Sequence, residues 1–252
     1  MDALIGSTGY VGGTLLAQRH FAARYHSTDI AAIRGQRFGR LVCAGATAVK
    51  WWANANPGED RRRIQSLMAD LRHVEAERFV LISTIDVYGH PVATTEADPP
   101  APTQPYGRHR LELERFAAHH FPRVHIVRLP ALFGPGLKKN ALYDLLHDNR
   151  LELVHPQSRL QWYPLARLAD DLARTEAAGL PLVNLATPPL AMATIRDRFF
   201  PGAAIGAQAA PPAHYDARTR HAALFGGPPG YALGLDAVLA ALAAFIAAER
   251  AP

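Results

Sequence analysis

The sequence predicts an α/β fold in which a parallel sheet carries helices on both faces. Compact apolar runs at residues 40–46 and 79–89 are typical of strands that are buried on both sides. Segments with helical spacing of apolar residues separate such runs, and this alternation favours parallel strands joined by helices. A cluster of glycines follows the first strand, at the carboxyl end where sheets of this kind bind ligands.

In the first half of the chain strands and helices alternate up to a polar, proline-rich loop at 90–105, except that only a short segment separates the strands at 22–27 and 40–46. The second expected helix begins at Pro57, a favourable first helical residue, and Asn56 with Glu59 forms a capping arrangement around it. The strands expected here are residues 2–6, 22–27, 40–46 and 79–89. The helices expected here are residues 10–20, 57–75 and 106–120.

The second half continues the alternation and shows no internal repeat. A strand at 124–134 and a helix at 138–149 are followed by a short apolar segment at 151–154. Beyond it we expect a helix at 166–178, a strand at 181–186, a short helix near 193–199, a loop rich in Pro, Gly and Ala at 201–214, and a closing helix.

The composition indicates a globular chain of one large domain, or of one domain with a small appendage. Its 252 residues are 49% apolar, enough to bury a substantial core. Cys43 is the single cysteine, so an intramolecular disulfide and a cysteine-based metal site are excluded. The histidines show no metal-ligand spacing, so we expect no metal. We see no signal-peptide pattern and no run of about 18 apolar residues, so we expect a cytoplasmic protein without membrane contact.

The net charge of +5 does not by itself indicate a nucleic-acid partner, because the arginines are scattered rather than striped. The one basic run, Arg61–Arg63, follows Glu59 and Asp60, which favours a solvated helix face over a binding patch. We therefore expect a small-molecule partner and no nucleic acid.

Gly6, Gly9, Gly12 and Gly13 lie within the stretch "ALIGSTGYVGGTL". Glycine inside a strand or helix costs roughly 0.5–1 kcal/mol relative to alanine, so such a cluster needs a cause. One cause is a tight turn. The other is a ligand that approaches the backbone, because the following helix N-terminus offers unpaired N–H groups and positive partial charge to a phosphate.

A second group of residues lies at the end of the strand "STIDVYG" (83–89) and in the segment "PYGRHRLELE" (105–114). Tyr106, Arg110 and Glu114 share one helix face because they are spaced four residues apart. This face is either an exposed stripe in which Arg110 pairs with Glu114, or a face that presents a phenol to the strand end.

These motifs together resemble the extended short-chain dehydrogenase/reductases, the NAD-dependent epimerases, dehydratases and reductases of nucleotide sugars. Gly6-x-x-Gly9-x-x-Gly12 is similar to their dinucleotide loop, and "PYGRHRLELE" is similar to their P-Y-G-x-S-K-x-x-x-E. "VRLPALFGPG" resembles their R-x-x-N-V-Y-G-P-G, and "VNLATPPLAMATI" looks like a strand-to-helix step of their substrate lobe. The resemblance covers most of the chain.

The resemblance implies a Rossmann-type doubly wound parallel sheet with a small C-terminal substrate lobe. Residues 1–150 would form the NAD(P)-binding domain, and residues 151–252 a substrate-binding lobe interleaved with it rather than an independent domain. The implied reaction is hydride transfer on a hydroxyl or carbonyl of a nucleotide sugar or similar polar substrate. Tyr106 would be the acid/base, Thr84 would hold the substrate oxygen, and a cation at position 110 would lower the phenol pKa from about 10. The implied cofactor contacts are Gly6, Ser7, Thr8, Gly9, Tyr10, Val11, Gly12, Arg24, His26, Ser27, Ala44, Gly45, Ser83, Arg110 and Pro130.

The sequence departs from the family pattern at three positions. Arg110 stands where lysine is expected, Ala131 replaces an asparagine and Phe133 a tyrosine. Arginine keeps the charge but cannot yield a proton. It therefore indicates either drift in an arginine-rich chain that stays active, or a non-catalytic NAD(P)-binding sensor or scaffold.

The choice between NAD and NADP depends on the segment after the second strand. Arg24, His26 and Ser27 come before Asp29, so the acidic residue that would bind the ribose of NAD is late. Because arginine suits a 2′-phosphate, the early position of Arg24 slightly favours NADP. NAD remains the alternative, because Asp29 could bind its ribose.

Three basic residues are candidates for contact with a phosphate-bearing substrate: Lys50, Lys138 and Arg159. For Lys50 and Lys138 a solvated surface lysine is the alternative. Members of the resembled family pair through two helices, here 57–75 and 106–120, so the resemblance also implies a homodimer.

Overall fold

The computed structural model describes residues 1–251, and the chain divides into two compact units. The first unit comprises residues 1–90, 98–129 and 167–183, and the rest of the described chain forms the second. The sequence predicts a cofactor-binding domain before residue 150 and a substrate-binding lobe after it. The two compact units do not show which part binds which ligand, so this division stays a prediction. No helix in the described part of the chain is long and apolar enough to cross a membrane.

The first unit is built on a six-stranded sheet. Its strands are β1 (Asp2–Ile5), β2 (Ala23–Tyr25), β3 (Arg37–Cys43), β4 (Glu75–Thr84), β6 (Val124–Leu129) and β9 (Leu182–Asn184). They lie in the order β2-β1-β3-β4-β6-β9, with parallel pairing of β1 to β2 and β3, and of β4 to β3 and β6. The parallel sheet that the sequence predicts is confirmed. The strand order reverses between β1 and β3, the point at which open sheets bind ligands.

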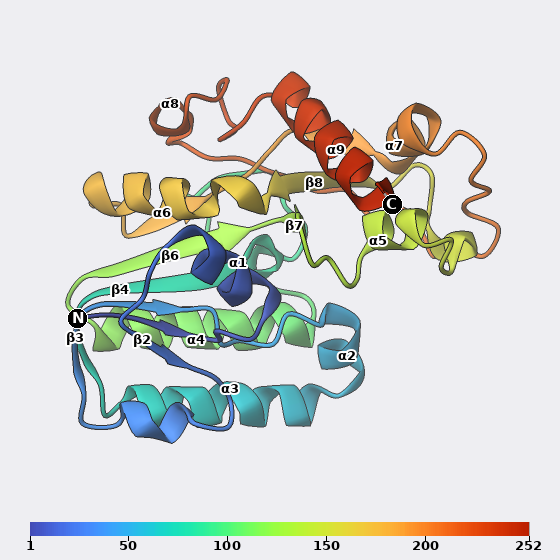
Figure 1. The fold of residues 1–252 in the computed structure, drawn as a ribbon. Helices are drawn as coiled ribbons and strands as arrows, with labels where there is room; N and C mark the ends of the chain where they lie inside the picture. The colour runs from blue at the N-terminus through green and yellow to red at the C-terminus, as the bar shows by residue number, and fades with distance from the viewer. Residues whose placement is uncertain (252) are drawn as a thin grey trace. The chain divides into compact units, whose positions relative to one another are not determined.

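Helices cover both faces of this sheet (Figure 1). They are α1 (Tyr10–Gln18), α2 (Lys50–Ala55), α3 (Pro57–Leu71), α4 (Pro105–His120) and α6 (Leu168–Ala177), and a short 3₁₀ turn, η2 (Ile85–Tyr88), follows β4. Helices α3 and α4 pack together on one face, and α1 contacts α6 on the other. The main core lies between the sheet and α3 and α4, where Ile5, Leu67, Phe79 and Leu113 are buried.

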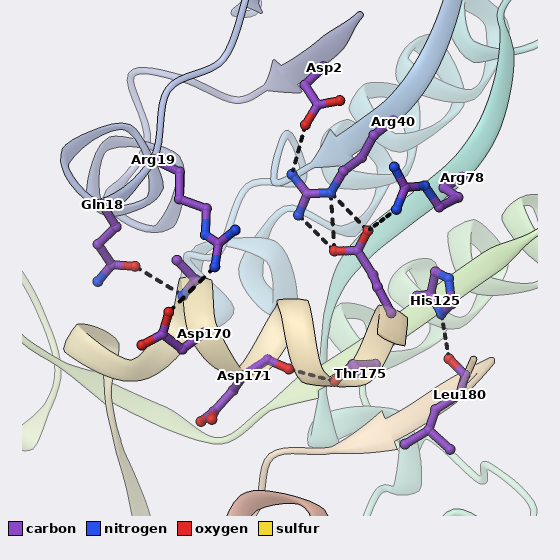
Figure 2. A network of polar contacts seen from close by, with 12 residues as sticks. Asp2, Gln18, Arg19, Arg40, Arg78, His125, Asp170, Asp171, Thr175 and Leu180 are labelled. Carbon is purple, nitrogen blue, oxygen red and sulfur yellow. Dashed lines mark hydrogen bonds and ion pairs between the residues drawn. The ribbon is translucent and has the colours of Figure 1, made fainter. Parts of the chain in front are cut away.

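Helix α6 belongs to the first unit because an almost fully buried ion pair attaches it to the sheet. Arg40 on β3 donates to both carboxylate oxygens of Glu176 at distances from 2.7 to 3.1 Å. Figure 2 shows Arg40 beside Asp2, and Gln18 directed at the start of α6, where its side chain accepts the Ala169 N–H at 3.0 Å. These contacts place a late stretch of sequence on the first sheet.

The second unit contains shorter elements. Its strands are β5 (Val92–Thr94), β7 (Ala131–Phe133), β8 (Arg159–Pro164), β10 (Pro189–Ala191) and β11 (Asp216–Ala217), and its helices are α5 (Ala141–Leu146), α7 (Met192–Phe199), α8 (Ala222–Phe225) and α9 (Leu235–Arg250). Strands β10, β8 and β7 form one sheet, and β11 pairs with β5. Trp162 and Tyr163 on β8 are fully buried, and the rings of Phe133 and Phe245 lie 5.8 Å apart.

The structure corrects three details of the sequence-based assignment. The single strand predicted over 124–134 is two strands, because Pro130 cannot donate a ladder hydrogen bond and separates β6 from β7. The structure contains helix α2 and strand β8, which the sequence did not predict. Asn56 is the N-cap residue of α3, but its side chain donates to the Trp52 carbonyl at 3.0 Å, so the expected capping arrangement does not form.

Candidate active site

The turn between β1 and α1 needs glycine at two positions for reasons of packing alone. Gly6 has a φ of +87°, and a Cβ on it would overlap the Ala44 carbonyl. A Cβ on Gly12 would overlap the carbonyl of Gly6. Within the described residues, a Cβ on Gly9 would meet a single backbone oxygen at 3.2 Å, and one on Gly13 a backbone oxygen at 3.9 Å. The fold therefore requires Gly6 and Gly12, whereas a ligand that approaches the backbone gives a reason for Gly9.

The same turn leaves the N-terminus of α1 suited to an anion. The N–H groups of Gly6 and Ser7 both donate to the Tyr25 carbonyl, at 2.8 and 3.2 Å, which fixes the turn against β2. Gly9 is the N-cap residue, no side chain of the described residues caps the helix, and its first turn has no acidic residue. The positive partial charge of this helix end is therefore not offset locally.

A cavity of about 320 Å³ adjoins this turn in the first unit. Asp29 contributes to its wall, but the Asp29 carboxylate accepts the backbone N–H of His26 at 2.6 Å and lies 3.3 Å from the His26 Nε2. Arg24 is exposed and forms no ion pair within the described residues. The cavity is lined by Ser7, Thr8, Leu16, Arg24, His26 and Asp29. It brings together four of the predicted cofactor contacts.

Thr84 and Tyr106 lie where α4 packs against the end of β4 and the turn η2. Thr84 donates its hydroxyl to Asp86 Oδ2 at 3.2 Å and accepts the Asp86 backbone N–H at 3.1 Å. Tyr106 is the second residue of α4 and is only 7% exposed. Its N–H donates to Asn54 Oδ1 at 3.0 Å, which ties the start of α4 to α2.

The phenol of Tyr106 carries a raised pKa in this environment. Burial is the largest influence and raises the pKa, while the guanidinium of Arg110 opposes it. The carboxylate of Asp86 raises the pKa further, and both the ammonium of Lys50 and a hydrogen bond with Thr84 lower it. The phenol is therefore protonated at neutral pH, as suits a group that donates a proton to a substrate oxygen.

Arg110 is buried and faces α3 rather than solvent. Its guanidinium pairs with the Asp60 carboxylate and donates to the Thr47 carbonyl. The guanidinium carbon also lies 4.1 Å from the centre of the Tyr106 ring. Burial raises the pKa of Asp60, but hydrogen bonds from Arg110 and His109 lower it more, so the net pKa is lowered and the carboxylate is ionised.

The predicted alternative, an exposed stripe in which Arg110 pairs with Glu114, is wrong. Glu114 is buried and pairs instead with Arg128 on β6, at 2.5 and 2.9 Å. It also accepts the Ser83 hydroxyl at 2.5 Å. The hydroxyl of Ser83, a predicted cofactor contact, thus donates to a buried ion pair that joins α4 to the sheet.

The remaining predicted contacts lie in different parts of the chain. Ala44 and Gly45 follow β3 in the first unit, as does Lys50 at the start of α2, whereas Pro130 belongs to the second unit. Tyr10 and Val11 open α1, and Ser27 follows β2. Two acidic residues of the site, Asp86 and Asp60, were not singled out by the sequence. For Asp86 a signal existed, because it stands two residues after Thr84 at the end of a strand.

The second unit holds a cavity of its own, of about 640 Å³. Arg159 lines it, whereas Lys138 is exposed elsewhere in this unit. Asp216 accepts the Tyr231 hydroxyl at 2.6 Å and pairs with Arg218 at 2.8 Å. The lining residues are Val92, Arg159, Pro189, His214, Tyr215, Asp216, Arg218 and Tyr231. Among residues 1–251 no group of three or more His, Cys, Asp or Glu side chains is placed to hold a metal ion.

Comparison with known proteins points to one family. Residues 40–153 match the model of the NAD dependent epimerase/dehydratase family. The fold resembles MoeE5 in complex with UDP-glucose and NAD, with a TM-score of 0.76, 18% identity and 98% of each chain covered. It also resembles the NAD-dependent NDP-hexosamine 5,6-dehydratase TunA, with a TM-score of 0.71, 18% identity and 97% and 98% of the two chains covered.

A third similar structure is the UDP-N-acetylglucosamine 4-epimerase of Methanobrevibacter ruminantium M1 in complex with UDP-N-acetylmuramic acid, with a TM-score of 0.75, 12% identity and 97% and 96% of the two chains covered. No curated protein sequence matches the chain. The family match covers the segment with Thr84, Tyr106 and Arg110, and it confirms the resemblance on which the sequence-based expectations rest.

Proposed function

We propose, on the premise that residues 40–153 carry an NAD-dependent epimerase/dehydratase domain, that this chain is a nicotinamide-dependent enzyme that modifies a sugar nucleotide. One observation carries the proposal. The glycine turn after β1 and the Thr84–Tyr106 group after β4 belong to one compact unit, and both lie at carboxyl ends of parallel strands. A ligand bound at the turn therefore lies at the same edge of the sheet as the phenol.

The residues of the turn fit a dinucleotide. The uncapped N-terminus of α1 suits a diphosphate, and the space beside Gly9 lets it approach the backbone. The adenosine ribose would occupy the cavity lined by Ser7 and Thr8. When bound, the nicotinamide ring would accept or supply the hydride.

The chain's own residues would move the proton. Thr84 would hold the substrate oxygen through its hydroxyl at the end of β4. Tyr106 would donate its phenol proton to that oxygen, and in the reverse direction the phenolate would take the proton back; the phenol is buried and Thr84 is within its hydrogen-bonding reach. Asp86 accepts the one proton of the Thr84 hydroxyl and donates its own backbone N–H to it, so in this arrangement Thr84 would hold a substrate hydroxyl by accepting its hydrogen bond.

NADP is the dinucleotide that we propose. The Asp29 carboxylate is engaged by the His26 N–H, whereas Arg24 is exposed at the cavity wall and forms no ion pair within the described residues. A 2′-phosphate would gain a charge-assisted hydrogen bond there. Calorimetry with both oxidised dinucleotides tests this: Arg24→Met should weaken NADP binding more than NAD binding. As a control, Arg37→Met changes an exposed arginine at the amino end of β3 and should alter neither. Equal losses for the two dinucleotides would contradict the preference.

For the substrate we propose a phosphate-bearing sugar nucleotide. The solved relatives include complexes with UDP-glucose and UDP-glucuronic acid. Arg159 lines the cavity of the second unit, which is large enough to receive a polar ligand. Lys138 supplies a further exposed cation in that unit. We also propose the homodimer through α3 and α4, which light scattering or analytical ultracentrifugation would detect.

A second candidate function, a dinucleotide sensor without catalysis, is favoured by the position of Arg110. Its guanidinium is held by Asp60 and the Thr47 carbonyl, so it is not presented to a cofactor as the family's lysine would be. Such a protein would bind NAD(P) but would transfer no hydride to any of a panel of sugar nucleotides.

Tyr106→Phe distinguishes the two functions. It removes one hydroxyl and leaves the glycine turn intact, so an enzyme should lose turnover by about 10²-fold or more while its dinucleotide affinity changes little. A Tyr106→Phe variant that turns over a proven substrate at the normal rate would disprove the role of the phenol.

A further inference from the structure

Arg110 occupies the position of the family's lysine, but both of its terminal nitrogens bind protein groups. One terminal nitrogen pairs with Asp60 and lies 3.4 Å from the Tyr106 carbonyl, and the other donates to the Thr47 carbonyl. The Nε of Arg110 is buried without a hydrogen-bond partner in the described residues. Its charge reaches the phenol through the face of the ring and is offset by Asp60.

Lys50 is a second cation beside the same phenol, on a different element. It begins α2, and its Nζ lies 2.5 Å from Asp86 Oδ1. The other oxygen of that carboxylate accepts the Thr84 hydroxyl at 3.2 Å. Asp86 therefore connects the ammonium of Lys50 to the hydroxyl at the end of β4.

The placement of Lys50 is supported by the packing of its helix. Asn54, one turn further along α2, accepts the N–H of Tyr106 at 3.0 Å. Helix α2 contacts α4, and the backbone oxygen of Asp86 lies where a Cβ on Gly107 would be. Glycine at position 107 thus lets the start of α4 pack tightly against the turn that carries Asp86.

We propose that Lys50, held by Asp86, is the positioning cation of the Tyr106–Thr84 pair, in the role that the family's lysine has at position 110. This inference rests on the acid/base role proposed above for Tyr106. A lysine ammonium is compact and carries three donors on a flexible stem, so a lysine can contact a carboxylate and a second group at the same time. Arg110 keeps a structural role between α4 and α3.

The charges that face the phenol come from three elements. Helix α4 supplies Arg110, the turn η2 supplies Asp86, and α2 supplies Lys50. Strand β4 contributes the uncharged Thr84, and from α3 Asp60 is paired with Arg110. Removing Lys50 should therefore raise the pKa of the phenol, and removing the charge of Asp86 should lower it.

A titration of the substrate-free protein tests the charge effect directly. The tyrosinate absorbance of Tyr106 is isolated by subtracting the titration of the Tyr106→Phe variant. We expect Lys50→Met to move the phenol pKa upward, Lys50→Arg to restore it, and Asp86→Asn to move it downward. Arg37→Met, at the amino end of β3, should leave the pKa of the phenol unchanged. An unchanged pKa in Lys50→Met, or one that Lys50→Arg fails to restore, would overturn the proposal. Circular dichroism of each variant checks that the fold is retained.

Turnover of a proven sugar nucleotide gives an independent test. Lys50→Met should lower kcat by about 10- to 100-fold near neutral pH with little change in KM, and the loss should shrink as the pH rises. If Lys50→Met is as active as the native protein while Tyr106→Phe is inactive, the role of Lys50 is wrong and the proposed function stands. If Tyr106→Phe is also fully active, the proposed function itself fails.

Discussion

Replacing Arg110 with methionine should destabilise the first unit strongly, because it leaves Asp60 as a buried and poorly compensated charge. The Asp60 side chain is 1% exposed, and one of its oxygens, Oδ1, already has no hydrogen-bond partner in the described residues. The other oxygen accepts both Arg110 and, at 2.6 Å, His109. Of these two partners of the Asp60 carboxylate, only His109 remains after the substitution.

The size of the effect follows from the cost of breaking such a pair. Removing one partner of a buried ion pair costs about 3–5 kcal/mol. For a chain of this size each kcal/mol lowers Tm by about 2–4 °C, so Arg110→Met should lower Tm by roughly 6–20 °C. Arg110→Lys keeps the charge but not the forked geometry of the guanidinium. Its Tm should therefore lie between those of the native protein and Arg110→Met.

Urea denaturation followed by circular dichroism measures the effect. Arg37→Met breaks an exposed pair with Glu75, at 3.1 Å, and should cost no more than about 1 kcal/mol. The double variant of Arg110→Met with Asp60→Asn should recover part of the lost stability, because it removes the unpaired charge. A loss below about 1 kcal/mol for Arg110→Met would refute the structural role of the guanidinium.

Three further predictions concern the turn, the thiol and acid stability. Gly12→Ala should destabilise the fold because its Cβ overlaps the Gly6 carbonyl, whereas Gly13→Ala should be neutral or stabilise α1; equal thermal shifts would contradict this. Burial raises the pKa of the Cys43 thiol to about 11, so a thiol reagent should label it only after unfolding, and fast labelling of the native protein would be inconsistent with the fold. The lowered pKa of Asp60 gives stability that is present above its unfolded pKa of about 3.9 and is lost as the pH falls through the folded pKa. Asp60→Asn should therefore lose less stability than the native protein between about pH 5 and about pH 2 in acid titrations of unfolding.

Much of the fold could be predicted because it is encoded locally. Apolar runs bounded by turns predicted β1, β3 and β4, and proline at the first helical position predicted the start of α3. Strand β8 was missed because Arg159 and Gln161 interrupt its apolar residues and Pro164 ends it, so no compact apolar run marks the strand. The apolar run at 124–134 predicted one strand, but Pro130 has no N–H to donate to a neighbouring strand and divides the run into β6 and β7.

The site was predictable as a set of motifs but not as a set of contacts. The sequence placed Tyr106 and Arg110 on one helix face, yet it offered no way to know that Arg110 meets Asp60, fifty residues earlier in the chain. It likewise gave no indication that Lys50 meets Asp86, because that pair joins two elements that only the packing of α2 brings together. Helical spacing predicts which residues share a face, whereas the partner across the interface depends on tertiary structure.

Isothermal titration calorimetry of oxidised NAD and NADP against three proteins tests the dinucleotide site most directly. The native protein should bind at least one of the two, and Gly9→Ala should weaken binding by about tenfold or more, because its Cβ enters the space that the diphosphate needs. Gly13→Ala, four residues further along the same turn and helix, should bind like the native protein. No heat with either dinucleotide at millimolar concentration, or equal affinity in all three proteins, would contradict the site.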